Sequence, residues 1–174
     1  MLQRCPNTEI RLPSFTSRLL GPLDATQNFW GEETDITIAS KGTRVWYFVF
    51  GAELRSQAGL DEAERLIDRL DELDGLARRA IRDQVSEAKS TVAEFKDLHA
   101  HDIGDMTEEL FGTTNVTDDV FLGALVIVGL AVTPGSDADA ISIDYAVGAG
   151  KPTDQVLMVT FSPAGAVTRI AHVS

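Results

Sequence analysis

The stretch "TDITIASKGTRVWYFVFG", residues 34–51, decides the fold class of this chain. Residues 36–39 and 44–50 are rich in β-branched and aromatic side chains, which favour strands. The glycine-containing "SKGT" between them is typical of a hairpin turn. The second strand alternates two apolar sets: Val45, Tyr47 and Val49 on one face, and Trp46, Phe48 and Phe50 on the other.

Because both faces of this strand are apolar, we expect it to be central in its sheet and covered on both sides. A second copy of the chain would supply one of these covers. Trp46 and Phe48 are therefore a candidate homodimer interface.

The period changes to that of a helix over residues 59–101. Gly75 lies between two apolar stripes, and the pattern leaves open whether it separates two helices or weakens one. The charged face, which includes "DEAER" at residues 61–65, is expected to be solvated. The two stripes recur at steps of three and four residues: Leu60, Ala63, Ile67 and Leu70, then Ile81, Val85, Ala88, Val92, Phe95 and Leu98.

Strands follow the helices at residues 123–133, 141–147, 155–161 and from 167 to the end, and Thr117 is a predicted helix N-cap before them. This order predicts one α+β domain, residues 1–174, with a mainly antiparallel sheet packed against a long helix or helical hairpin. Residues 1–28 are expected to form an N-terminal arm or an edge strand.

The net charge of −12 disfavours nucleic acid and anionic membranes, and it favours basic partners or simple solubility. Cys5 is the only cysteine, so no intrachain disulfide can form, which fits a reducing cytoplasm. The longest apolar run, residues 120–132, is too short to cross a membrane as a helix and is interpreted as a buried strand. We expect a soluble, cytoplasmic protein.

No motif predicts a catalytic, cofactor-binding or metal-binding residue. "GAGK" at residues 148–151 fails as a phosphate loop, because Tyr145 replaces the first glycine and Pro152 the final hydroxyl residue. "HAHD" at residues 99–102 does not bring three metal ligands together, and "DAD" at 137–139 lacks the rest of a calcium loop. The sequence therefore leans away from an enzyme without excluding one.

The last two strands are predicted to form a hairpin around "SPAG", with Phe161 opposite Val167 and Val156 opposite His172. The face with Met158 and Ile170 is expected to be core.

A histidine at such a sheet edge, here His172, is more often structural than catalytic. Asp144, Tyr145 and His172 nevertheless form a speculative pocket between helices and sheet if they converge, although the pattern favours a shared sheet.

The stretch "IDYAVGAGKPTDQVLMVTFSPAGAVTRIAHVS", together with "LDELDGLARRAI" and "VAEFKDLHAHDI", resembles a family of uncharacterised bacterial proteins with a domain of unknown function. The resemblance spans residues 61–174, and the chain ends in "AHVS" where an acidic residue is usual. Some relatives look like immunity proteins, which implies a non-enzymatic module with a protein partner, such as a basic toxin, and no active-site residues. The alternative is a small-molecule-binding or hydrolytic domain.

Overall fold

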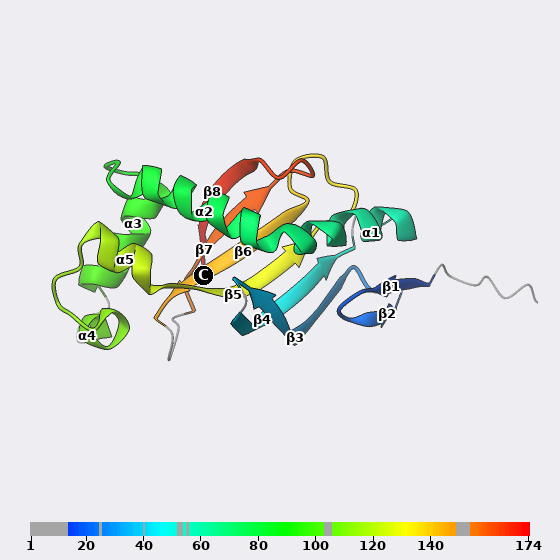
Figure 1. Ribbon diagram of the computed structural model, residues 1–174, viewed down its shortest axis with the longest axis horizontal. Helices are drawn as coiled ribbons and strands as arrows, with labels where there is room; N and C mark the ends of the chain where they lie inside the picture. Colours follow the sequence, from blue (N-terminus) through cyan, green and yellow to red (C-terminus); the bar gives the residue numbers. More distant parts are fainter. Residues whose placement is uncertain are drawn as a thin grey trace, which may run out of the picture.

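The computed structural model describes residues 14–24, 26–39, 41–51, 54, 56–102, 106–148 and 154–174 (Figure 1). The strands are β1 (Phe15–Ser17), β2 (Gly21–Leu23), β3 (Phe29–Ile38), β4 (Lys41–Phe50), β5 (Leu125–Val132), β6 (Ile141–Val147), β7 (Val156–Phe161) and β8 (Val167–Val173). The helices are α1 (Gln57–Glu64), the 3-10 helix η1 (Arg65–Arg69), α2 (Leu70–Val85), α3 (Thr91–Asp97), the π-helical η2 (Leu98–Asp102), α4 (Met106–Phe111) and α5 (Asp118–Ala124).

Six strands form one sheet in the order β3-β4-β5-β6-β7-β8. The pair β4–β5 is parallel, and the other neighbouring pairs are antiparallel. A parallel pair needs a long crossover, and all the helices lie in the connection from β4 to β5. The predicted α+β class with a mainly antiparallel sheet is confirmed.

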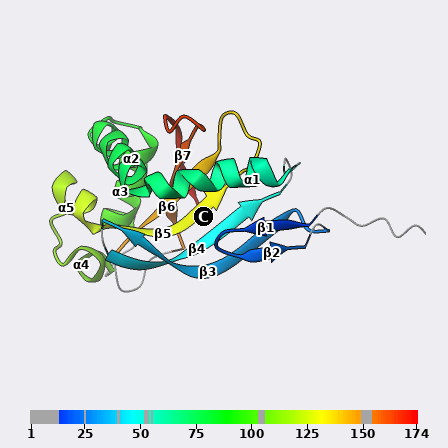
Figure 2. The ribbon, with the colours of Figure 1, turned by 45° about the vertical axis from the view of Figure 1, so that its right-hand side comes forward.

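Helices α1 and α2 run across one face of the sheet (Figures 1 and 2). Gly75 lies inside α2, so it does not separate two helices. The interruption comes at residues 86–90, where the Ser90 hydroxyl accepts a hydrogen bond from Ala93 N–H and begins α3. In the described residues, no helix is long and apolar enough to cross a membrane. The face of α2 that packs inward is fully or almost fully buried: Leu70, Leu73, Ala77, Ile81 and Val85.

Among the described residues, other elements cover strand β4 on one face only. Tyr47 and Val49 face the helices and are 0% exposed, whereas Trp46 is 50% and Phe50 42% exposed on the other face. Helices α1 and α2 lie on the same side of the sheet and cover one face of β4, so the second cover expected from another copy of the chain stays a prediction. An exposed apolar face on β4 remains.

The apolar run at residues 120–132 is not a single strand. Residues 118–124 form α5, and β5 begins only at Leu125. The Thr117 hydroxyl accepts from Val120 N–H and the Thr117 carbonyl from Phe121 N–H, so the predicted N-cap is confirmed. This cap overrides the strand preference of the residues that follow, because one helical turn buries both Phe121 and Leu122.

Replacing Thr117 by alanine is expected to lower the free energy of unfolding by about 1 kcal/mol, because α5 loses its only side-chain N-cap acceptor. Urea denaturation followed by circular dichroism measures the change. The matched control is Thr114→Ala at a nearby exposed threonine, which should change stability little. Equal losses in the two variants would contradict the capping role.

The hairpin β7–β8 has the predicted pair Phe161–Val167, but the following pairs are shifted. An irregularity between Thr160 and Phe161 adds one residue to β8, so His172 lies opposite Leu157 and not Val156. The shift places Ile170 opposite Val159, so Ile170 packs against the core as predicted. The prediction for Met158 was wrong, because the buried residues of β7 are its neighbours Leu157 and Val159.

Strands β1 and β2 pair with each other and lie beside α1 (Figure 2). Residues 1–13 are outside the described part of the chain. The hairpin is attached through Glu64 at the end of α1. Its buried carboxylate accepts hydrogen bonds from the Ser17 hydroxyl at 2.6 Å, the Arg18 N–H at 2.8 Å and the Tyr47 hydroxyl at 2.8 Å. Glu64 in "DEAER" is therefore buried, contrary to the expected solvated face.

Candidate functional site

The structure does not bring Asp144, Tyr145 and His172 together. Tyr145 pairs with Leu157, and Leu157 pairs with His172, so Tyr145 and His172 lie on one face of the sheet with a strand between them. Asp144 precedes Tyr145 in β6 and points to the opposite face. The speculative pocket is therefore divided by the sheet.

Tyr145 has a structural role on the helical side. Its hydroxyl donates to Asp74 Oδ1 at 2.7 Å, and Arg78 forms an ion pair with the same carboxylate and lies 5.4 Å from the tyrosine ring centre. Burial, together with the nearby Asp74, raises the pKa of the tyrosine well above its usual range. The phenol therefore stays neutral and joins β6 to α2.

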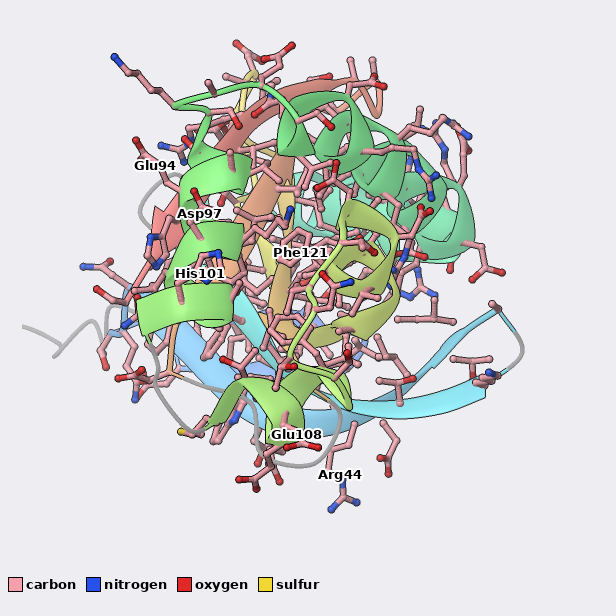
Figure 3. All side chains as sticks on the ribbon, turned by 90° about the vertical axis from the view of Figure 1, so that its left-hand side faces the viewer. Arg44, Glu94, Asp97, His101, Glu108 and Phe121 are labelled. Carbon is pink, nitrogen blue, oxygen red and sulfur yellow. The ribbon has the colours of Figure 1, made fainter. Side chains whose placement is uncertain are left out.

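The two histidines near β8 also pack against the helical layer. His172 Nε2 donates to Gln155 Oε1 at 2.6 Å, and its ring contacts the edge of Phe95 at a centre distance of 5.1 Å. His99 is buried, its Nδ1 donates to the Phe95 carbonyl, and burial lowers its pKa. His101 of the same motif is exposed and labelled in Figure 3. The described residues contain no group of three possible metal ligands.

The opposite side of the sheet carries a row of aromatic rings on β3 and β4. Phe48 stacks on Phe29 at 5.3 Å and on Trp46 at 6.1 Å, with the latter planes only 8° apart. A Cβ atom at Gly31 would lie 2.4 Å from the Phe48 ring, so this glycine makes room for the ring over β3. We call this patch the aromatic face: the exposed Phe29, Trp46 and Phe50 together with the half-buried Phe48.

Charged residues border the aromatic face. Arg44 projects from β4 away from the helical layer (Figure 3) and forms an ion pair with Asp35 at 3.2 Å. Glu33 is the cross-strand neighbour of Trp46. Since Arg44 is balanced by Asp35, this border is acidic overall.

Asp144 lies on the same side of the sheet as the aromatic face. Gly129 of β5 pairs with Trp46 on one side and with Asp144 on the other. The Asp144 carboxyl lies over this glycine, because a Cβ atom there would be 2.8 Å from Asp144 Oδ2. Asp144 Oδ1 is buried without a hydrogen-bond partner, and burial raises the pKa of Asp144 from 3.8 to about 6. Such a group is a candidate binding residue.

Two of the cavities in the structure bear on these residues. One of about 180 Å³ lies between α1 and the connection from β5 to β6, and its lining includes neither Asp144, Tyr145 nor His172. It is smaller than the 300–1,000 Å³ typical of small-molecule sites. The second, of about 370 Å³, lies between the β1–β2 hairpin and β3 and includes Phe29 and Gly31 in its lining. It therefore adjoins the aromatic face.

The sequence predicted Asp144 and the pair Trp46–Phe48 as parts of two unrelated features, and the structure places all three on one side of the sheet. The parity of β6 separates Asp144 from Tyr145, and a glycine inside the apolar run "VIVGLAV" signals a close approach of another group. Residues 149–151 of "GAGK" and Cys5 lie outside the described residues.

No protein-family model matches this chain, and neither the search of curated proteins nor that of solved structures found a similar protein.

Proposed function

We propose that this protein is a non-enzymatic binding module that uses the aromatic face to bind a basic protein, as an immunity protein binds its toxin. The observation that carries the proposal is the row of stacked, exposed rings on an uncovered side of β3 and β4. Contiguous exposed aromatic residues are enriched at protein interfaces and form their energetic centres.

The charge of the chain favours a basic partner over a second copy. The net charge of −12 attracts a cationic protein and accelerates its association. Two copies meeting through this face would instead bring together two acidic borders and two Asp144 carboxyls that lack a cation. A second copy of the chain, as in the homodimer predicted from Trp46 and Phe48, is therefore less favoured as the partner of the aromatic face.

The alternative of a hydrolytic or small-molecule site has less support. The Tyr145 hydroxyl is bound to Asp74 and the His172 ring to Gln155, and neither residue lines the cavity beside α1. A nucleophile, a base and an oxyanion donor would need to converge for acyl transfer.

The test is reconstitution of the complex with a partner isolated from the source cells by affinity capture and then purified. Calorimetric titration should give a dissociation constant that rises at least about tenfold for Trp46→Ala, as expected for an interface hot spot. The affinity should also fall with salt concentration, because the partner is basic. Asp97→Asn, a charge removal at an exposed site on α3, is the matched control and should bind normally (Figure 3).

Sedimentation of the unbound protein provides the opposing outcome. If the unbound protein is a dimer and Trp46→Ala dissociates it, a second copy of the chain and not a basic partner binds the aromatic face. A captured partner that binds Trp46→Ala and Phe48→Ala as tightly as the unaltered chain would overturn the proposal.

A further inference from the structure

We infer that the aromatic face contains an anchoring site for an arginine side chain, formed by Trp46 and Asp144 on either side of Gly129. This inference rests on the proposed function and deepens it, because it names the group of the partner that is bound. Its evidence is the register of three neighbouring strands and the unsatisfied carboxyl at their centre.

The geometry of the site follows from the sheet. Trp46 on β4 and Asp144 on β6 are separated by two strand spacings, or about 10 Å, with β5 between them. Gly129 on β5 has no side chain, and the Asp144 carboxyl occupies the space above it, so the carboxyl extends over β5 toward Trp46. Trp46 is 50% exposed, which leaves much of its indole accessible from solvent.

The Asp144 carboxyl and the Trp46 indole both favour binding of a cation. Asp144 Oδ1 has no hydrogen-bond donor, and an ionised carboxyl in this position lacks the positive charge that a buried carboxylate requires. The indole ring attracts a cation to its face. A guanidinium group suits both side chains better than an ammonium group, because it is planar, stacks on aromatic rings and is less strongly hydrated.

The charged groups near Asp144 do not already supply this cation. The cross-strand neighbours of Asp144 are Gly129 on β5 and Met158 on β7, which carry no charge. Farther away on the same side of the sheet, Arg44 is paired with Asp35, with Glu33 as its acidic neighbour. Arg169 on the outer strand β8 lies 3.8 Å from Asp139. Among the described residues, the carboxyl of Asp144 therefore has no ion-pair partner.

Arginine binding at this site is expected to weaken in acid. The pKa of Asp144 is about 6 in the unbound protein, and a bound guanidinium favours the ionised form. At pH 5 only about a tenth of the carboxyls are ionised, so the affinity should be roughly tenfold lower than at pH 7. A site formed by surface acids of ordinary pKa would not change over this range.

The experiment is a titration of the ¹⁵N-labelled protein with Nα-acetyl-arginine N-methylamide, followed by NMR chemical shifts. The matched ligand is the citrulline derivative, which has a similar shape without the charge. We expect shifts at the Trp46 indole N–H and the Gly129 and Asp144 amides, with a dissociation constant below about 10 mM at pH 7. The citrulline derivative should give no such shifts, and the lysine derivative weaker ones.

Two variants test the Asp144 carboxyl and the Trp46 indole separately. Asp144→Asn and Trp46→Ala should each weaken arginine binding at least about tenfold while keeping a folded spectrum. Asp97→Asn on α3 should bind normally. Three results would each overturn the inference: equal shifts with the citrulline derivative, no shifts with the arginine derivative at about 10 mM, or unchanged binding by Asp144→Asn.

The failure of this inference is distinguishable from that of the proposed function. If the reconstituted partner depends on Trp46 but binds Asp144→Asn normally, the arginine anchor is wrong and the aromatic face remains the binding surface. If neither variant affects the partner, both proposals fail.

Discussion

Replacing Glu64 by alanine is expected to lower the free energy of unfolding by about 4 kcal/mol, the largest effect of any substitution considered for this chain. The Glu64 side chain is 0% exposed and accepts three hydrogen bonds, from Ser17, Arg18 and Tyr47. These three donors belong to the β1–β2 hairpin and to β4, so a single carboxylate connects α1 with two separate parts of the fold.

The size of this effect comes from the donors that the substitution leaves behind. The Tyr47 hydroxyl, in a side chain that is 0% exposed, would lose its acceptor, and the Ser17 hydroxyl and Arg18 N–H would lose theirs. Each buried donor without a partner costs about 1–3 kcal/mol. The ion pair between Arg18 and Asp68 is exposed and compensates little of this loss.

Urea denaturation of Glu64→Ala measures the effect, and Glu62→Ala is the matched control. Glu62 lies on the same helix but is exposed, so its removal should change the free energy of unfolding by less than about 0.5 kcal/mol. Limited proteolysis should also cleave the β1–β2 hairpin faster in Glu64→Ala, because the hairpin loses its attachment to α1. Similar stabilities for the two variants would show that the carboxylate is not needed.

The fold class was predictable because its signals are local. Alternation in residues 44–50 and the helical period of residues 59–101 are set by which side of each element meets the core. The N-cap at Thr117 was also predictable from the sequence, since its acceptor and donor are only three residues apart. The start of β5 was not, because the same apolar residues suit a buried helix or a buried strand.

The features that the sequence did not reveal depend on contacts between distant residues. Glu64 appears in a run of alternating charges, and only the docking of Ser17 and Arg18, more than 40 positions earlier, makes it a buried acceptor. Trp46 meets Gly129 through a parallel pairing that spans the whole helical connection. The candidate site could therefore be predicted as separate residues but not as one surface.

Replacing Asp144 by asparagine is expected to raise the free energy of unfolding by about 2 kcal/mol at pH 7, although it should weaken arginine binding at least about tenfold. The folded-state pKa of about 6 lies above the unfolded value of 3.8, so the native protein prefers the neutral carboxyl. This contribution to stability is fully present below pH 3.8 and is lost as the pH rises through 6. At pH 7 the unchanged protein therefore contains an ionised, unpaired carboxyl that the asparagine variant lacks.

The measurement is urea denaturation of Asp144→Asn and of the control Asp97→Asn at pH 7 and pH 4. The gain from Asp144→Asn should appear at pH 7 and shrink to near zero at pH 4, whereas Asp97→Asn should show little change at either pH. A gain of the same size at both pH values would mean that the ionised carboxyl is not the cause. A buried charge without a partner lowers the stability of the free protein until a ligand neutralises it. If Asp144 lowers stability but strengthens arginine binding, its role is in binding and not in folding.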